Sequence, residues 1–329
     1  MLPVQIAGMG THLPDHIITS AALETQLHLP DGWIERVAGV RERRYALTET
    51  SSGMAALACE RALAAAGIDR GDIDLIVGAS SGPQQLIPCT AALVQRALGA
   101  PDGRSACYDV GATCLSFLFA LHQVAHLISA GVYRRALIFS SEVSFRSLNP
   151  AEPESAVLFG DSAVAAVVTA ALPGAASALH HARFETHASG ADLTRLLGGG
   201  SLHHPNDPAT TPEDNMFHMD GSGVFKKAVR LVGPFLDAFL GETGWRREEI
   251  DRVVPHQASR HGVEVLHARL GFRADQVFSN LAVRGNCIAA STPLALAEAV
   301  EAGAVQRGSR VLHIGTGAGL TIGAVALTY

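Results

Sequence analysis

The stretch GIDRGDIDLIV, residues 67–77, reappears as GWRREEIDRVV at residues 244–254, an ungapped match at an offset of 177 residues. Each copy starts with a glycine suited to a helix C-cap, continues through a short charged loop and enters an apolar strand that begins Ile-Asp. Apolar residues at helical spacing precede both copies, over residues 54–66 and 224–240. The stretch therefore predicts a helix–loop–strand unit that occurs twice in the chain.

Further matches follow in the same order along the chain. They are the Ala-Gly helix ends at 130–131 and 302–303 (offset 172), the strands at 136–139 and 310–314, and the final strands at 160–169 and 317–328. Their common order predicts two pseudo-symmetric α/β halves, residues 1–172 and 173–329. Strands that alternate with helices favour mixed, mainly parallel sheets covered by helices. Chemistry in such folds collects at strand C-terminal ends and helix N-termini, where the halves would meet.

Composition excludes several classes of protein. The net charge is −6 and no basic block occurs, so a protein that wraps nucleic acid is not expected. The apolar run at residues 115–128 is too short to span a membrane, and no secretion signal is seen. The five cysteines include no CxxC pair, and no metal-binding spacing occurs among the histidines. We expect a cytoplasmic protein without a membrane segment, a disulfide framework or a metal.

Cys114 follows a strand end at 108–110 and the turn Gly111-Ala112-Thr113, and we expect it to open a helix that runs to about residue 130. A thiol at a helix N-terminus feels the positive end of the macrodipole, which favours the nucleophilic thiolate. Cys114 could instead be a small buried apolar residue, which is the usual fate of a cysteine.

The repeat supplies two further candidates. Adding the offset of 172 to position 114 gives Asn286. The two halves would therefore place a thiol and a carboxamide at equivalent helix starts. His256 directly follows the strand of the second copy, at the C-terminal edge of the sheet. Alternatively, His256 is a core histidine and Asn286 a helix N-cap.

Cys, His and Asn that converge from three distant strand ends suit covalent acyl transfer. The thiolate takes the acyl group, and the imidazole and carboxamide stabilise negative oxygen on a second substrate. The turn at 315–320 lacks the glycines of a dinucleotide-binding loop at positions 320 and 322. Its N–H groups could instead form a second oxyanion hole.

The chain resembles the thiolase superfamily, and within it the ketoacyl-ACP synthase III branch of condensing enzymes. Seven motifs occur in family order: Gly32-Trp33-Ile34 with Gly39-Val40-Arg41-Glu42-Arg43, residues 109–114, Phe159-Gly160-Asp161, Val224-Phe225-Lys226, residues 254–258, Gly285-Asn286 with Ala289-Ala290-Ser291, and Gly317-Ala318-Gly319. The resemblance implies a five-layer αβαβα fold, a homodimer, and a catalytic triad of Cys114, His256 and Asn286.

The resemblance also implies how the site works. An acyl group moves from CoA or an acyl carrier protein to the cysteine, and the enolate of a malonyl-carrier thioester attacks it. The N–H groups of Cys114 and Ala318 would hold the acyl oxyanion. No resident cofactor is expected, because phosphopantetheine arrives as part of CoA or the carrier protein.

Substrate contacts implied by the resemblance involve Trp33, Ile87 and Ser259, to which we add Arg146 near the entrance loop and Lys226 on a helix face. Some positions depart from the common family pattern. Ile87 replaces an aromatic residue that reaches into the partner's acyl pocket, and Ser259 replaces an asparagine. Val37 and His261 stand where arginines are usual. These departures favour a synthase of secondary metabolism that accepts a longer or acidic acyl group.

One helical face carries three cations, Lys226, Lys227 and Arg230. This face could receive an acidic carrier protein, or it could simply be solvated.

Alternative functions remain open. The chain could initiate primary fatty-acid synthesis from acetyl-CoA, or it could be a non-catalytic partner with a condensing-enzyme fold. Thiol hydrolysis of the protease type also uses Cys, His and Asn, although it would not need two oxyanion sites.

Overall fold

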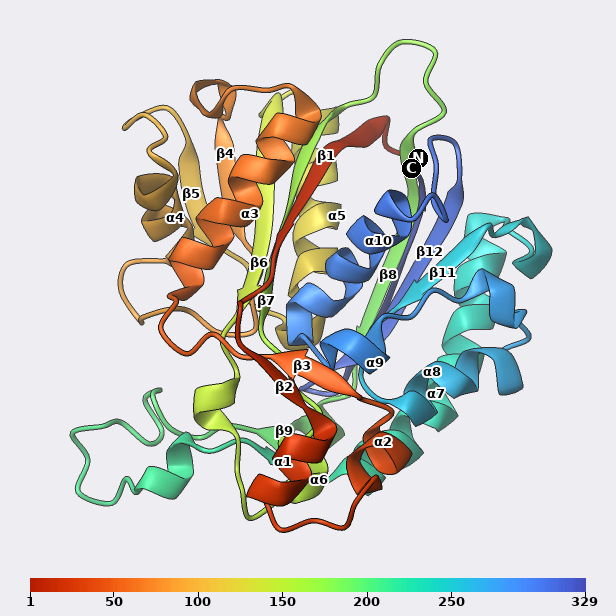
Figure 1. Cartoon of the computed structure of the whole chain (residues 1–329). Coiled ribbons are helices and arrows are strands. Elements are labelled where there is room, and N and C mark those ends of the chain that lie inside the picture. Colours follow the sequence, from red (N-terminus) through yellow and green to blue (C-terminus); the bar gives the residue numbers. More distant parts are fainter.

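The computed structural model describes residues 1–329 apart from the side chain of His267. Two main sheets form its framework, each built from strands of one end of the chain (Figure 1). The first sheet has the order β1-β7-β6-β4-β5, with β1 at Val4–His12, β7 at Ser162–Ala170, β6 at Arg135–Glu142, β4 at Leu75–Gly78 and β5 at Ala106–Asp109. The second has the order β11-β12-β13-β8, with β11 at Arg252–Pro255, β12 at Arg310–Gly317, β13 at Thr321–Thr328 and β8 at Ala178–Thr186.

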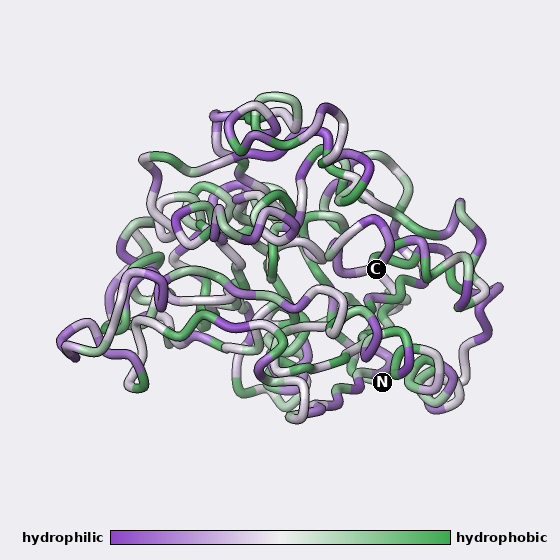
Figure 2. Tube along the Cα trace, turned by 90° about the horizontal axis from the view of Figure 1, so that it is seen from below, coloured by the Kyte–Doolittle hydropathy of each residue, from purple (hydrophilic) through white to green (hydrophobic). Residues whose placement is uncertain are grey.

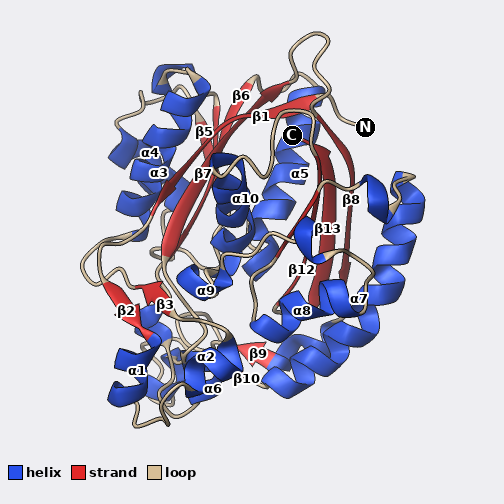
Figure 3. Cartoon of the chain, turned by 45° about the vertical axis from the view of Figure 1, so that its right-hand side comes forward, coloured by secondary structure: helices blue, strands red, loops and turns tan.

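Helices form three layers around and between the sheets, which confirms the five-layer αβαβα fold (Figure 3). One outer layer packs on the first sheet and holds α3 (Ser51–Ala66) and α4 (Thr90–Leu98). The central layer holds α5 (Ser116–Ser129) and α10 (Ser291–Glu301). The other outer layer holds α7 (Gly221–Thr243) and α8 (Arg260–Ala268).

Shorter elements complete the chain. The short helices are α1 (Ser20–Gln26), α2 (Trp33–Ala38), α6 (Pro153–Ala156) and α9 (Leu281–Arg284), and the short strand pairs are β2 (Ile17–Thr19) with β3 (Glu42–Arg44) and β9 (Thr194–Arg195) with β10 (His218–Met219). The 3₁₀ turns are η1 (Arg70–Asp72), η2 (Thr113–Leu115), η3 (Phe145–Ser147), η4 (Ala188–Leu193), η5 (Pro212–Asn215), η6 (Arg247–Glu249), η7 (Ala274–Gln276) and η8 (Ile288–Ala290).

The repeated stretch folds in the same way twice. Gly67 caps α3 and Gly244 caps α7, both in the left-handed region with φ of 64° and 72°. The turns η1 and η6 follow, and the strands β4 and β11 come next. Both strands pair in parallel with the next strand of their half, β6 and β12. The helix–loop–strand prediction is therefore confirmed.

The expectation of mainly parallel sheets is wrong. Among the described strands of the two main sheets, three pairings are parallel and four are antiparallel. The last two strands of the chain show the reason. Only residues 318–320 separate β12 from β13, and so short a link forces an antiparallel hairpin.

Apolar side chains fill the spaces between the layers. One cluster lies between the two sheets, around the central helices, and includes Leu118 of α5 and Leu296 of α10. Separate clusters fill the spaces under α3 and α4 and under α7. Each fully buried side chain of this size contributes about 1.5–3 kcal/mol. Figure 2 shows apolar segments running through the middle of the trace, with hydrophilic ones common in the outer loops.

Candidate active site

Cys114 lies in η2, between the edge strand β5 and the central helix α5. Thr113 has a φ of 48°, which a β-branched residue adopts only under strain. The α-helix itself begins at Ser116, two residues after the cysteine. The expectation that Cys114 opens the helix is therefore wrong, because a tight 3₁₀ turn intervenes.

The thiol of Cys114 is not poised as a thiolate. Burial raises its pKa to about 12, and the nearby carboxyl of Glu142 adds to the rise. Hydrogen bonds from the N–H groups of Ala318 and of Cys114 itself, and from the Thr113 hydroxyl, act in the opposite direction. The N–H groups therefore favour the thiolate as expected, but the cost of burying the charge is larger, and the pKa is raised rather than depressed.

The C-terminal half reaches this thiol through the end of β12. A Cβ on Gly317 would lie 2.9 Å from Thr113 Oγ1 and 3.5 Å from the Cys114 nitrogen, so the strand can approach this closely only with glycine. Ala318 follows directly, and its N–H points at the thiol. Two backbone donors therefore converge on Cys114 from two halves of the chain.

His256 follows β11 directly, and its N–H donates to the Ile314 carbonyl at 2.9 Å. Ala79 makes the same bond in the first half, to Phe139 at 2.8 Å, so His256 occupies a repeated position. Its side chain is buried, and Nδ1 has no hydrogen-bond partner among the described residues. Burial lowers the pKa of His256 to about 4, which keeps the imidazole neutral at pH 7.

Asn286 is buried, forms a β-bridge to Phe159 and lies two residues before the turn η8. Its Oδ1 accepts hydrogen bonds from the Ile288 N–H at 2.9 Å and from Ser291 Oγ at 3.4 Å. Its Nδ2 lies 3.5 Å from the carbonyl oxygen of Ala258, a long contact for a hydrogen bond. The amide N–H₂ is therefore held beside the segment that carries His256 and retains donor capacity.

The prediction that Cys114 and Asn286 occupy equivalent positions in the two halves is wrong by three residues. Ile288 repeats the positive φ of Thr113, at 48°, and η8 leads into α10 as η2 leads into α5. The counterpart of Cys114 is Ala289, three residues beyond Asn286. The helix α10 has 11 residues and α5 has 14, so an offset read from the helix ends does not hold at their starts.

A buried carboxyl that the sequence analysis missed completes the surroundings of the thiol. Glu142 ends β6, is 3% exposed, and accepts hydrogen bonds from the N–H and hydroxyl of Ser81 and from the N–H of Ala289. Burial raises its pKa to about 8. Its place at the C-terminal end of a predicted strand, after an apolar run, is the signal that could have identified it.

Two of the expected substrate-binding residues lie on exposed loops. Ile87 is 85% exposed and precedes a cis proline, Pro88. Arg146 is also exposed, and its guanidinium donates to the Leu47 carbonyl at 3.2 Å and stacks over the ring of Phe145. This position fits the alternative of a loop arginine engaged with the protein surface.

The remaining three lie at helix starts. Trp33 begins α2 and packs, partly buried, against an apolar cluster that includes Ile34 and Phe159. Ser259 caps α8 by accepting the Gly262 N–H. Lys226 is exposed near the start of α7, whereas its neighbour Lys227 is tied to the backbone of Ser189 at 2.7 Å. The cationic face of α7 is thus smaller than the spacing predicts.

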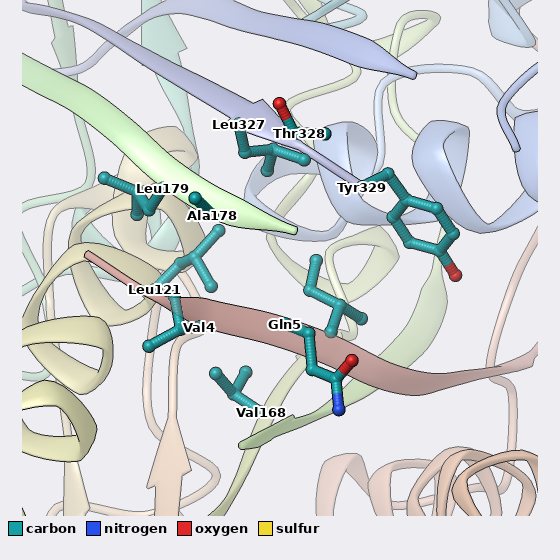
Figure 4. Close-up of a pocket in the computed structure, with 10 residues that line it drawn as sticks. Val4, Gln5, Leu121, Val168, Ala178, Leu179, Leu327, Thr328 and Tyr329 are labelled. Carbon is teal, nitrogen blue, oxygen red and sulfur yellow. The ribbon is translucent and has the colours of Figure 1, made fainter. Parts of the chain in front are cut away.

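Among the described residues, no group of three or more His, Cys, Asp or Glu residues is arranged to hold a metal ion. No described helix is long and apolar enough to cross a membrane. A small cavity of about 20 Å³ lies where β1, β8 and β13 meet, lined by Leu121, Leu179 and other apolar residues (Figure 4). It has room for about one water molecule and none of the candidate residues lines it.

Comparison with known proteins identifies the family to which the chain belongs. The family model of 3-oxoacyl-[acyl-carrier-protein] synthase III matches residues 108–188. A second model, of the C-terminal part of the same family, matches residues 240–329. A β-ketoacyl-[acyl-carrier-protein] synthase III of Streptomyces coelicolor is 36% identical over 98% of this chain and 96% of its own.

Solved structures show the same relationship. The 3-oxoacyl-[acyl-carrier-protein] synthase III of Aquifex aeolicus superposes with a TM-score of 0.89 at 33% identity, over 99% of this chain and 100% of its own. The priming β-ketosynthase of the R1128 polyketide pathway has a TM-score of 0.89 at 30% identity, over 98% and 96% of the two chains. The chain belongs to the 3-oxoacyl-[acyl-carrier-protein] synthase III family of condensing acyltransferases.

Proposed function

We propose that this chain forms a carbon–carbon bond by Claisen condensation, with Cys114 as the nucleophile. The observation that carries the proposal is the convergence of the Ala318 and Cys114 N–H groups on the Cys114 thiol. An acyl oxygen attached to that sulfur would lie within reach of the same donors, as an oxyanion hole requires.

The first step transfers an acyl group from an acyl-CoA or acyl-carrier thioester. The Cys114 sulfur forms a bond to the acyl carbon, the old carbon–sulfur bond breaks, and the leaving thiol takes up the cysteine's proton. Because burial favours the neutral thiol, the proton leaves Cys114 only as the new carbon–sulfur bond forms. The protein needs no resident cofactor, since phosphopantetheine belongs to the substrate.

The second step joins the acyl group to a malonyl- or ketoacyl-carrier thioester. A malonyl group loses CO₂, and its enolate carbon attacks the acyl carbon while Sγ of Cys114 leaves and takes up a proton from water to restore the thiol. Neutral His256 and the Asn286 amide would donate hydrogen bonds to the enolate oxygen. Their environment supports this role, because His256 is neutral and Asn286 keeps donor capacity.

The same contacts argue against a hydrolase of the protease type. Such a site needs the asparagine to orient the histidine through its ring nitrogen. Here the Oδ1 of Asn286 is taken by Ile288 and Ser291, and Nδ1 of His256 has no partner among the described residues.

For the substrate, we propose a longer or acidic acyl group and a role in secondary metabolism. Ile87 in place of an aromatic ring, together with Val37, Ser259 and His261, supports this choice. The similarity to a priming ketosynthase of a polyketide pathway fits it as well. The alternative is initiation of primary fatty-acid synthesis with acetyl-CoA, which the synthase III relatives equally support. Product masses from acetyl-CoA and from longer donors distinguish the two.

We also propose a cytoplasmic homodimer that receives an acyl carrier protein. The edge strand β5 has no neighbour on its outer side among the described strands, and Leu86 and Ile87 are 69% and 85% exposed nearby in the chain. A second copy would cover both features. Lys226 and Arg230 remain exposed on α7 and could meet an acidic carrier surface.

Acylation tests the proposal. After incubation with a panel of acyl-CoA and acyl-carrier thioesters, intact mass spectrometry should show one added acyl group that is absent in Cys114→Ala. The matched variant Cys89→Ala should acylate like the wild type. A wild-type protein that stays unmodified across the panel would contradict the proposal and favour a non-catalytic partner subunit.

A further inference from the structure

The carboxyl of Glu142 joins the two halves of the chain beside the nucleophile. It lies at the end of β6 in the first half and accepts the Ala289 N–H from η8 in the second. It also accepts the N–H of Ser81 at 2.7 Å and the Ser81 hydroxyl. A buried carboxyl with this many donors is held in one place, since each lost bond would leave a buried polar group unpaired.

Serine hydroxyls continue from this carboxyl to the turn of Cys114. Ser80, the neighbour of Ser81, accepts the Ser141 N–H through its hydroxyl at 2.9 Å. The carbonyl of Ser80 accepts the Ser116 hydroxyl at 3.1 Å. That hydroxyl also contacts the Thr113 carbonyl at 2.8 Å and accepts the Ala112 N–H at 2.9 Å. The strained turn η2 is thus braced on one side by Ser116, which hydrogen-bonds the Ser80 carbonyl, and the backbone links Ser80 to Ser81 and so to Glu142.

This network also reaches the loop of residues 80–88, which connects β4 to α4 and ends at Ile87 and Pro88. We propose that Glu142 is a positioning residue that holds the Cys114 turn and couples it to the 80–88 loop, and that the charge of its carboxyl sets the reactivity of the thiol. The inference rests on the proposed role of Cys114 as the nucleophile.

The ionisable groups near Glu142 determine whether its charge favours or opposes a thiolate at Cys114. Cys114 and Asp161 are the ionisable groups that interact with it, and the Ser81 and Ala289 donors favour its charged form. Burial dominates, so the carboxyl is mostly neutral at pH 7 and charged above about pH 8. A charged Glu142 opposes a thiolate at Cys114, and a neutral one does not.

The test is the pH dependence of Cys114 alkylation by iodoacetamide, followed by peptide-resolved mass spectrometry so that the other cysteines do not interfere. Glu142→Gln keeps the shape of the side chain without its charge. We expect its thiol pKa to fall by about one unit, so that alkylation at pH 9 becomes roughly tenfold faster than in the wild type. Ser81→Ala removes a bond that favours the charged carboxyl, so suppression of alkylation should begin at a higher pH.

Two controls separate this effect from a loss of structure. Glu24→Gln alters a buried carboxyl that accepts the Gly32 and Ile34 N–H groups instead, and should leave the profile of Cys114 unchanged. Ser81→Ala serves if Glu142→Gln does not fold. A Glu142→Gln profile that coincides with the wild type, or is slower by one factor at every pH, would overturn the inference. Alkylation needs no acyl substrate, so this result is independent of whether condensation occurs.

Discussion

His256 and Asn286 stabilise charge on the second substrate in the proposed mechanism, and neither takes part in loading the acyl group. Asn286→Ala should therefore lower the condensation rate by roughly 10²–10³ while acyl transfer to Cys114 continues, because one oxyanion donor is lost. The two steps are measured separately, by intact mass for acylation and by product analysis for condensation. Asn206→Ala, in an exposed loop, is the matched control and should affect neither step.

The contrary result is equally clear. If Asn286→Ala stops acylation and condensation together, the amide supports the turn rather than the enolate, and its Oδ1 contact to Ile288 would explain the loss.

At the residue scale, residue types and strand ends could be predicted from the sequence, but protonation states could not. Cys114 and His256 stand directly after strands or turns, which the pattern of apolar residues indicates. The pKa of the thiol depends on how deeply the second half covers it and on Glu142, a residue 28 positions away in the chain. No local pattern contains that information.

The strand β1 lies so close to the helix α3 that a single glycine determines whether the two can pack together. A Cβ on Gly10 of β1 would lie 2.3 Å from the Ala58 carbonyl oxygen and 2.3 Å from the Ala62 nitrogen of α3. Both are backbone atoms, so neither can move aside without shifting the helix.

Gly10→Ala should destabilise the protein by about 2–3 kcal/mol, since overpacking against backbone costs this much. Urea unfolding measures the difference. Gly241→Ala is the matched control, because it lies within α7 with no atom within 4 Å of the added Cβ. Alanine is the better helix former, so this control should be as stable as the wild type or up to about 1 kcal/mol more stable. Equal effects in the two variants would contradict the packing account.

At the element scale, the sequence repeat predicted the strands and helices of both halves but not their relative lengths. The Ala-Gly motifs locate the C-terminal ends of α5 and α10, where glycine is required. The starts are set by the turns η2 and η8, whose positive φ residues are Thr113 and Ile288 rather than glycine. Nothing in their residue types marks those positions. The sequence repeat therefore paired Cys114 with a residue three positions before its structural counterpart.

The stability of the whole molecule should vary with pH through three buried groups. His256 and His313 have pKa values lowered to about 4 by burial, from 6.5. Between pH 6.5 and 4 the unfolded chain binds protons that the folded one does not, so stability falls as the pH falls, by on the order of 3 kcal/mol for each histidine. Burial of Glu142 acts in the opposite sense, because its raised pKa removes stability as the pH rises towards 8.

Urea unfolding at pH 4, 5, 6.5 and 8.5 tests both limbs. His313→Gln should flatten the fall in stability below pH 6.5 and leave the profile above it unchanged. Glu142→Gln should remove the loss of stability that runs from about pH 4.5 to about pH 8, which flattens the profile above pH 6.5 and steepens the fall below it. Two variants with identical profiles would show that the buried charges named here do not determine the pH dependence.

The most direct test of the account follows one acyl group through both steps. Cys114 is loaded with an acyl group labelled at its carbonyl carbon, the acyl-enzyme is separated from free thioester, and malonyl-carrier thioester is added. The account predicts that the label moves into a β-ketoacyl product and that the cysteine returns to its unmodified mass. Release of the label as free acid, with no labelled condensation product, would contradict the account.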